Sequence, residues 1–313
     1  MDMNRDRIRT SARYTRRQFG TLALAALPAA HVLSAPPSPW SLEPAPIDSR
    51  IKGVQIGAIT YSFRAIPDAR AIVSAMARIG LGGVELMSNH AEALAGAPDR
   101  TATDALTAWR ARASPETWRP VRKIFDDAGL DLRLLTYNMN VTRTNDEAIE
   151  YGFAMAKGLG VKGITTSTQV SMAKRVAPFA DKHKILVAYH GHADLKDPDE
   201  VATPQSFATC LSYSKYHAIN LDIGHFTAAG FDPVAFLSAN HARITNLHLK
   251  DRRSAANGGA NVPWGQGDTP IKAVLQLLSR EKWDIPANIE FEYPGDPLVE
   301  IPKCLQFCKD ALA

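Results

Sequence analysis

The chain of 313 residues is long enough for one large barrel or for two domains, so its length alone does not fix the architecture. Three cysteines, an odd number and a small one, exclude a disulfide framework. The net charge of +4 belongs entirely to residues 1–20, which hold six arginines against two aspartates. Residues 21–313 are therefore formally neutral, and we expect no nucleic-acid partner.

The first elements along the chain are a basic segment and a short apolar run. Arg16 and Arg17, with Phe19 two places later, precede the mildly apolar residues 21–30, a run too short to span a bilayer. This pattern resembles a twin-arginine export signal. We expect a signal at residues 1–35, a Pro-rich spacer at 36–50, a passage through the twin-arginine translocase and a periplasmic location. The alternative is a frayed basic tail on a cytosolic protein.

From residue 51 onward, strand-like runs alternate with segments of helical period. The expected strands are 54–61, 83–87, 132–138, 163–166, 185–190, 219–222, 244–249 and 288–293. The expected helices are 68–79, 117–128, 145–159, 171–182, 204–213, 233–240 and 271–281. Strands alternating with helices form right-handed parallel units, and eight units predict an α/β fold with a single (β/α)8 TIM barrel over residues 51–313. A doubly wound open sheet is the alternative, although no glycine-rich turn follows the first strand.

Close to the C-terminus, Cys304 and Cys308 lie one helical turn apart. We interpret both as core residues, with a regulatory disulfide as the alternative.

Four of the expected strands end in side chains that bind metals. The side chains are His190, His192, Asp222, His225, His248 and Glu290. The carboxyl ends of neighbouring strands converge in a barrel, so these groups are expected to meet at its mouth. Imidazole and carboxylate ligands without a thiolate suit one catalytic Mn²⁺, Co²⁺, Zn²⁺ or Fe²⁺ ion better than a structural zinc.

These motifs resemble the sugar phosphate isomerase/epimerase family, the xylose isomerase-like barrels that include endonuclease IV. The matching segments are Leu221 to His225, Leu247 to Asp251, Gly265 to Gly267 and Ile289 to Glu292. The resemblance implies that one divalent ion is held by His190, Asp222, His248 and Glu290. In the keto-sugar epimerases of this family a glutamate stands at the position of His190 and also serves as an acid/base group. The run from Tyr189 to His192 instead resembles the His-Asn-His variant of secreted or oxidoreductase-associated members.

Further polar residues near the strand ends are candidates for catalysis or substrate binding. The catalytic candidates are Glu290, Glu292, Glu85 and His192; the substrate-binding candidates are Lys250, His225, Arg64 and Asn138. Tyr61 is a further candidate for the lining of the pocket. Salt bridges for Lys250 and Glu292, and loop capping for Arg64, Tyr61 and Asn138, are the structural alternatives.

A divalent ion beside a base suits removal of a proton alpha to a sugar carbonyl, with the metal stabilising the enediolate. We expect an isomerase, epimerase or lyase that acts on an unphosphorylated keto-sugar or 3-keto-glycoside, since phosphorylated intermediates are kept in the cytoplasm. Replacement of a carboxylate by His190 favours a lyase or isomerase. The alternatives are an endonuclease IV-like phosphodiesterase and a non-catalytic periplasmic sugar-binding barrel. The sequence leaves the oligomeric state open.

Overall fold

A computed structural model describes residues 45–313 of the chain. The predicted export signal and residues 36–44 of the predicted spacer lie outside the described residues. Within residues 45–313, no helix is both long enough and apolar enough to cross a membrane.

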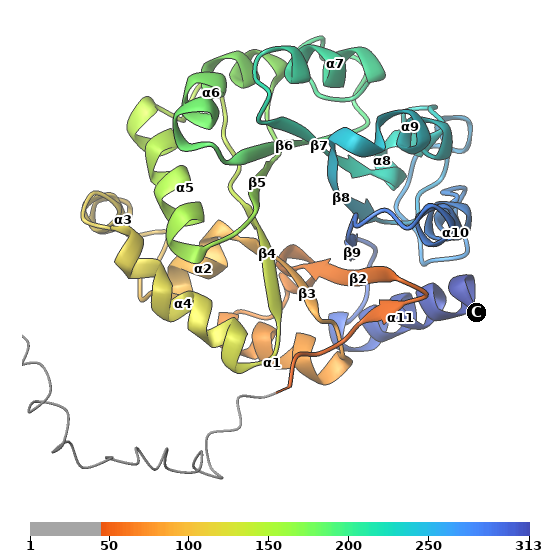
Figure 1. Cartoon of the computed structure of the whole chain (residues 1–313), viewed down its shortest axis with the longest axis horizontal. Helices are drawn as coiled ribbons and strands as arrows, with labels where there is room; N and C mark the ends of the chain where they lie inside the picture. Colours follow the sequence, from red (N-terminus) through yellow and green to blue (C-terminus); the bar gives the residue numbers. More distant parts are fainter. Residues whose placement is uncertain (1–44) are drawn as a thin grey trace, which may run out of the picture. The chain divides into compact units, whose positions relative to one another are not determined.

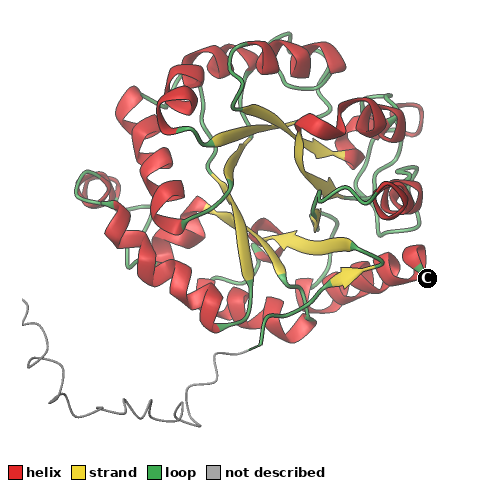
Figure 2. Ribbon diagram, viewed as in Figure 1, coloured by secondary structure: helices red, strands yellow, loops and turns green. Residues whose placement is uncertain are grey.

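Eight parallel strands close into a barrel (Figures 1 and 2). The strands are β2 (Val54–Ile59), β3 (Gly83–Met87), β4 (Asp131–Thr136), β5 (Gly163–Thr166), β6 (Leu186–His190), β7 (His217–Asp222), β8 (Ile244–Leu249) and β9 (Ala287–Ile289). Each strand pairs with the next in sequence, and β2 also pairs with β9, with Gly57 opposite Asn288. This last pairing excludes the open sheet and confirms the predicted TIM barrel. A short strand, β1 (Arg50–Ile51), pairs antiparallel with β2.

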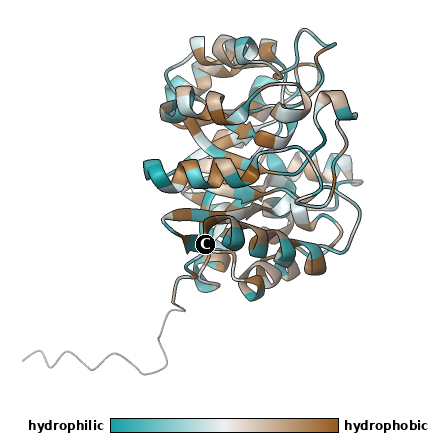
Figure 3. Ribbon diagram, turned by 90° about the vertical axis from the view of Figure 1, so that its right-hand side faces the viewer, coloured by the Kyte–Doolittle hydropathy of each residue, from teal (hydrophilic) through white to brown (hydrophobic). Residues whose placement is uncertain are grey.

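Helices surround the barrel, and hydrophobic residues alternate with hydrophilic ones along them (Figure 3). They are α1 (Ala69–Ile79), α2 (Ser88–Leu94), α3 (Thr103–Arg110), α4 (Pro115–Asp127), α5 (Asp146–Leu159), α6 (Val170–His183), α7 (Pro204–Ser212), α8 (Ile223–Ala228), α9 (Pro233–Asn240), α10 (Ile271–Glu281) and α11 (Pro297–Leu312). Several begin where the sequence supplies a cap: the side chains of Asp68 and Asn145 accept backbone N–H bonds at the starts of α1 and α5. Gly80 and Gly160 end these two helices in the left-handed conformation. Cys304 and Cys308 are buried and free, as expected of core residues.

The structure differs from the predicted elements mainly at the carboxyl ends of the strands. Helices α2 and α3 were not predicted, and they follow β3 before α4 begins. Helix α8 was also missed because it starts directly on the last residue of β7, with Asp222 as its N-cap and no intervening loop. The last strand is shorter than predicted and ends at Ile289, so Glu290 and Glu292 lie just beyond it.

The strands carry apolar side chains toward the helices and polar side chains toward the barrel axis. Val187, Leu221 and Leu247 belong to the apolar core that the strands share with the helices. Residues at alternate positions point the opposite way. Buried polar side chains occupy these inward positions: Glu85, Thr136, Thr165, Asn220, Asn246, His248 and Asn288. The barrel interior is therefore polar toward the carboxyl ends of the strands, and the candidate site lies at this end.

Candidate metal centre

A cavity of about 290 Å³ opens at the carboxyl ends of the strands. This volume is close to the lower end of the range for small-molecule sites, roughly 300–1,000 Å³. The residues that line it include His190, His192, Asn220, His225, His248, Lys250, Glu290 and Glu292 from the second half of the barrel. Ile59, Tyr61, Met87, Asn138 and Ser167 complete the opposite wall.

Four side chains come together at this cavity with the geometry of a metal site. His190, Asp222, His248 and Glu290 are all buried, and each offers one donor atom within 4.8 Å of the other three. Nδ1 of His190 is buried without a hydrogen-bond partner, as is Oδ2 of Asp222. Buried polar atoms in native proteins nearly always have partners, so these two atoms indicate a missing ligand. The donor set of two imidazoles and two carboxylates fits a divalent ion.

The helix that follows Asp222 orients its carboxylate. Its Oδ1 accepts the backbone N–H of His225 at 2.6 Å and caps α8. Oδ2 faces Lys250 Nζ at 3.1 Å but has no aligned hydrogen bond. One carboxylate oxygen thus fixes the side chain while the other stays available to an ion.

His248 lies between the carboxylates of Glu290 and Glu85. Its Nδ1 is 3.0 Å from Glu290 Oε2, and its Nε2 is 2.8 Å from Glu85 Oε2. Burial alone would lower the pKa of His248, but the charges of Glu85 and Glu290 outweigh burial and raise it well above its usual value. Nδ1 lies on the ligand side. A metal there would replace one proton, leaving Nε2–H donated to Glu85, the arrangement that orients many metal-binding histidines.

The catalytic role predicted for Glu85 gains no support, because its side chain is fully buried and does not line the cavity. Its carboxylate accepts hydrogen bonds from Thr136, Thr165, Asn246 and Asn288 in addition to His248. With both oxygens saturated, Glu85 has no lone pair free to take a substrate proton. Its position makes it a positioning residue for His248.

Three asparagines that support the ligands were not predicted. Asn220, Asn246 and Asn288 each stand two residues before a candidate ligand, and the first two share a strand face with theirs. Asn246 Nδ2 donates to Asn220 Oδ1 at 3.1 Å, and Asn288 Nδ2 donates to Glu85 at 2.8 Å. The repeated Asn-x-ligand spacing is a signal in the sequence that could have revealed this layer.

Lys250 and Glu292 share one buried ion-pair network. Lys250 Nζ lies 2.5 Å from Glu292, 2.9 Å from Glu290 and 3.1 Å from Asp222. Burial alone would lower the pKa of Lys250, but the three carboxylates, Asp222 foremost, outweigh burial and raise it. Lys250 is therefore a charged donor at the cavity wall. Its ammonium holds the carboxylate of Glu292 in place.

The protonation of the remaining ligands also suits metal binding. Burial lowers the pKa of His190 well below its usual value, so its imidazole is neutral and has a free lone pair. Burial raises the pKa of Asp222 to about 6, against the opposing charge of Lys250. Burial alone would raise that of Glu290 too, but the charges of Lys250 and His248 outweigh it and keep the pKa well below its usual value.

His192 lines the cavity and is held by a carboxylate that the sequence analysis did not identify. Its Nδ1 lies 2.6 Å from Glu200 Oε1, eight residues further along the same loop. If Nδ1 carries the proton toward Glu200, Nε2 keeps a lone pair that can accept one. No spacing rule in the sequence points to Glu200, because it acts from an irregular loop.

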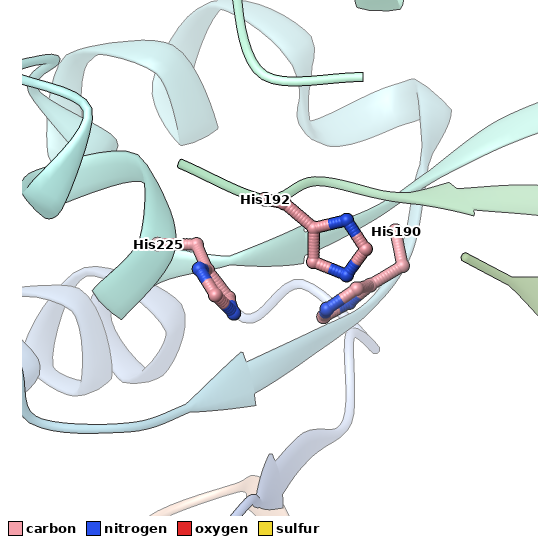
Figure 4. Close-up of side chains that lie close together, drawn as sticks. All are labelled: His190, His192 and His225. Carbon is pink, nitrogen blue, oxygen red and sulfur yellow. The ribbon is translucent and has the colours of Figure 1, made fainter. Parts of the chain in front are cut away.

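Three histidines form a second group of potential ligands around His190. Figure 4 shows the rings of His190, His192 and His225 gathered together, and their donor atoms lie within 4.8 Å of one another. This group has no carboxylate, and the Arg252 guanidinium donates to Nδ1 of His225. A dication there would have three neutral ligands, with the Glu200 carboxylate bonded to His192 and the positive charge of Arg252 beside His225. We therefore favour the group with two carboxylates.

The remaining predicted residues divide between the cavity and its supports. Asn138 lines the cavity and accepts the backbone N–H of Ser167 through Oδ1, which leaves its amide donor free. The predicted substrate-binding role of Arg64 gains no support: this exposed side chain donates to the Phe291 carbonyl and lies over the Tyr61 ring, and it is not part of the cavity lining. Arg64 joins the loop after β2 to the segment after β9.

The Gly265 to Gly267 motif organises the loop after β8. Asp251 accepts the backbone N–H groups of Gly265 and Gly267 at 2.8 and 3.0 Å. A Cβ atom at Gly267 would lie 2.1 Å from Asp251 Oδ1, so only glycine fits this close approach. The motif therefore has a structural role beside the metal site.

Comparison with known proteins finds one family match, to the second half of the barrel. The family described as xylose isomerase-like TIM barrel matches residues 167–311, the segment that supplies all four candidate ligands. No curated protein matches the chain.

Solved structures resemble the chain over most of its length. The probable 3-DHS dehydratase AsbF from Bacillus anthracis has 18% identity over 83% of this chain and 97% of its own, with a TM-score of 0.59. The IolI protein with a binding zinc atom has 14% identity over 82% and 96%, with a TM-score of 0.60. A sugar phosphate isomerase/epimerase from Parabacteroides distasonis has 17% identity over 82% and 95%, with a TM-score of 0.57. At such low identity these likenesses establish the shared barrel fold.

We predict that the purified barrel binds one divalent ion and that Asp222→Ala or His248→Ala abolishes binding. Glu85→Gln should weaken binding by about 10–100-fold, because it loosens the orientation of a ligand without removing one. Glu200→Gln, which alters no ligand of the four-residue group, is the matched control. Elemental analysis and competition with a chelating dye measure both quantities. Full metal content in Asp222→Ala would contradict the assignment.

Proposed function

We propose that this protein is a metal-dependent enzyme of the xylose isomerase-like family that removes a proton next to the carbonyl of a small carbohydrate. The observation that carries the proposal is the arrangement of the cavity, with four buried donor atoms on one side and an oriented histidine, His192, on another. The proposed substrate is an unphosphorylated keto-sugar or a 3-keto-glycoside.

His190, Asp222, His248 and Glu290 would hold the ion. When bound, it would supply a Lewis acid that polarises a substrate carbonyl and makes the neighbouring C–H bond more acidic. The two imidazoles would contribute lone pairs to the ion, and the two carboxylates would offset its positive charge.

His192 is the proposed base. Its Nε2 can take the alpha proton while Nδ1–H remains bonded to Glu200, whose carboxylate stabilises the resulting imidazolium. Glu292 is the weaker candidate because Lys250 holds its carboxylate. The ammonium of Lys250 lines the same cavity, where it can donate a hydrogen bond to an oxygen that becomes negative as the proton leaves.

The fate of the carbanion-like intermediate decides the type of reaction. Reprotonation of the same carbon on the opposite face gives an epimerase, reprotonation of the neighbouring carbon gives an isomerase, and loss of a beta substituent gives a lyase. His190 stands where epimerases of this family have a second acid/base carboxylate, which favours isomerisation or elimination. The names of the similar structures, an isomerase/epimerase and a probable dehydratase, support the same range of chemistry.

The rival functions receive less support. The cavity of about 290 Å³ has the volume for a small molecule, and the formally neutral residues 21–313 offer no strong attraction to a nucleic-acid backbone. A sugar-binding protein without catalysis would not need a histidine oriented by a carboxylate beside a metal-competent cluster.

We predict that His192→Gln lowers proton abstraction by about 10²–10⁴-fold and leaves metal content unchanged. The measurement is deuterium incorporation from D2O at the carbon next to the carbonyl, in a panel of keto-sugars and 3-keto-glycosides. His241→Gln is the control, since His241 stacks on Trp283 and does not line the cavity. Turnover with the original hydrogen fully retained at that carbon would rule out the mechanism.

We also propose export to the periplasm by the twin-arginine translocase, on the evidence of the sequence of residues 1–35. Replacing both Arg16 and Arg17 by lysine should leave the precursor in the cytoplasm, whereas Arg5→Lys with Arg7→Lys should not. Because this route carries folded proteins, the metal would be acquired before export. Cell fractionation tests the proposal, and normal export of the Arg16/Arg17 variant would refute it.

A further inference from the structure

A second cavity of about 600 Å³ lies next to the candidate metal centre. Met87, Asn138 and Ser167 line both cavities, so the two share a wall. The second cavity is built largely by helix α2, the segment that joins it to α3, and the loop between β4 and α5. The second cavity therefore adjoins the candidate metal centre through these three shared residues.

The one acidic side chain in the lining of this second cavity is already neutralised. Glu92 is nearly fully buried and receives two parallel hydrogen bonds from Arg110, at 2.7 and 2.9 Å. The Tyr151 hydroxyl donates a third, at 2.7 Å. Bidentate pairing of this kind fixes both charged groups. Glu92 and Arg110 thus form a rigid, neutral part of the wall.

Two further arginines in the lining have no such partner. Arg100 and Arg143 are exposed and form no ion pair with any carboxylate in residues 45–313, and both line a cavity whose only acid is saturated. The positive charge of Arg100 also acts on His90: burial, together with this charge, lowers the pKa of His90 to about 4. The side chains of Ser88 and Asn89 add further donors to the same lining.

We propose that this cavity binds an anionic substituent of the substrate, at the end remote from the reacting carbonyl. We call Ser88, Asn89, Arg100 and Arg143 the anion subsite. Two guanidinium groups with hydroxyl and amide donors match an oxyanion, which on the unphosphorylated substrate proposed above is a carboxylate or a sulfate; a phosphate shares this chemistry and serves as a probe. The substrate is accordingly an acidic sugar derivative. The inference rests on the proposed function for the position of the carbonyl, but binding of the anion does not depend on catalysis.

The test compares ligands that differ only in charge at one position. Glucuronate, glucose 6-sulfate, glucose 6-phosphate and glucose are titrated by calorimetry into the metal-loaded, mature protein. At least one anion should bind about ten- to hundredfold more tightly than glucose, and Arg100→Gln with Arg143→Gln should remove that difference. Arg112→Gln is the matched control, because Arg112 is an exposed arginine between α3 and α4 that lines neither cavity. Which anion binds most tightly distinguishes carboxylate, sulfate and phosphate.

Two results would overturn the anion subsite. One is equal affinity for glucose and all three anions, including the absence of any binding tighter than about 1 mM. The other is a preference for an anion that survives in the Arg100/Arg143 double variant. Metal content and deuterium incorporation are measured on the same proteins. If these fail while the charge preference persists, the proposed function is wrong and the subsite stands.

Discussion

The interior of this barrel depends on one buried negative charge, the carboxylate of Glu85. A charge without solvent in the centre of a closed sheet is costly unless every oxygen lone pair is occupied. Two threonines, two asparagines and His248 occupy them. Small residues make this layer possible, since a Cβ at Gly57 would lie 2.6 Å from Asn288 Oδ1. The polar layer orients His248 through its contact with Glu85, and His248 in turn contacts Glu290, another candidate ligand.

Charge in the site is unbalanced in a way that a dication would correct. Four buried or partly buried carboxylates (Glu85, Asp222, Glu290 and Glu292) are linked to only two side chains that can be positive, Lys250 and His248. The second histidine group lacks this excess of negative charge. In this group, His192 contacts Glu200 and suits the role of a base. His225 accepts a hydrogen bond from Arg252 and is neutral. Electrostatics thus separates the metal position from the position of the base.

The sequence predicted the barrel and the convergence of the strand ends because both follow from repeated local patterns. Apolar runs that end in His, Asp or Glu can be read one strand at a time, and the closing pair of β2 with β9 then brings the ends together. The positions of Glu85 and Arg64 could not be predicted, because depth within the barrel and the direction of a loop side chain depend on the register of neighbouring strands. Helices α2 and α3 were missed because they are additional helices between β3 and α4, and the regular alternation of one strand with one helix does not predict them.

Anomalous X-ray diffraction from crystals of the zinc-loaded protein tests the central claim most directly. The account predicts one strong peak at about 2.0–2.2 Å from the donor atoms of His190, Asp222, His248 and Glu290, with Nδ1 of His248 as the bound nitrogen. Figure 4 shows the group that would hold the ion if this account were wrong. A peak bounded by His190, His192 and His225, or no peak in the cavity, would contradict it.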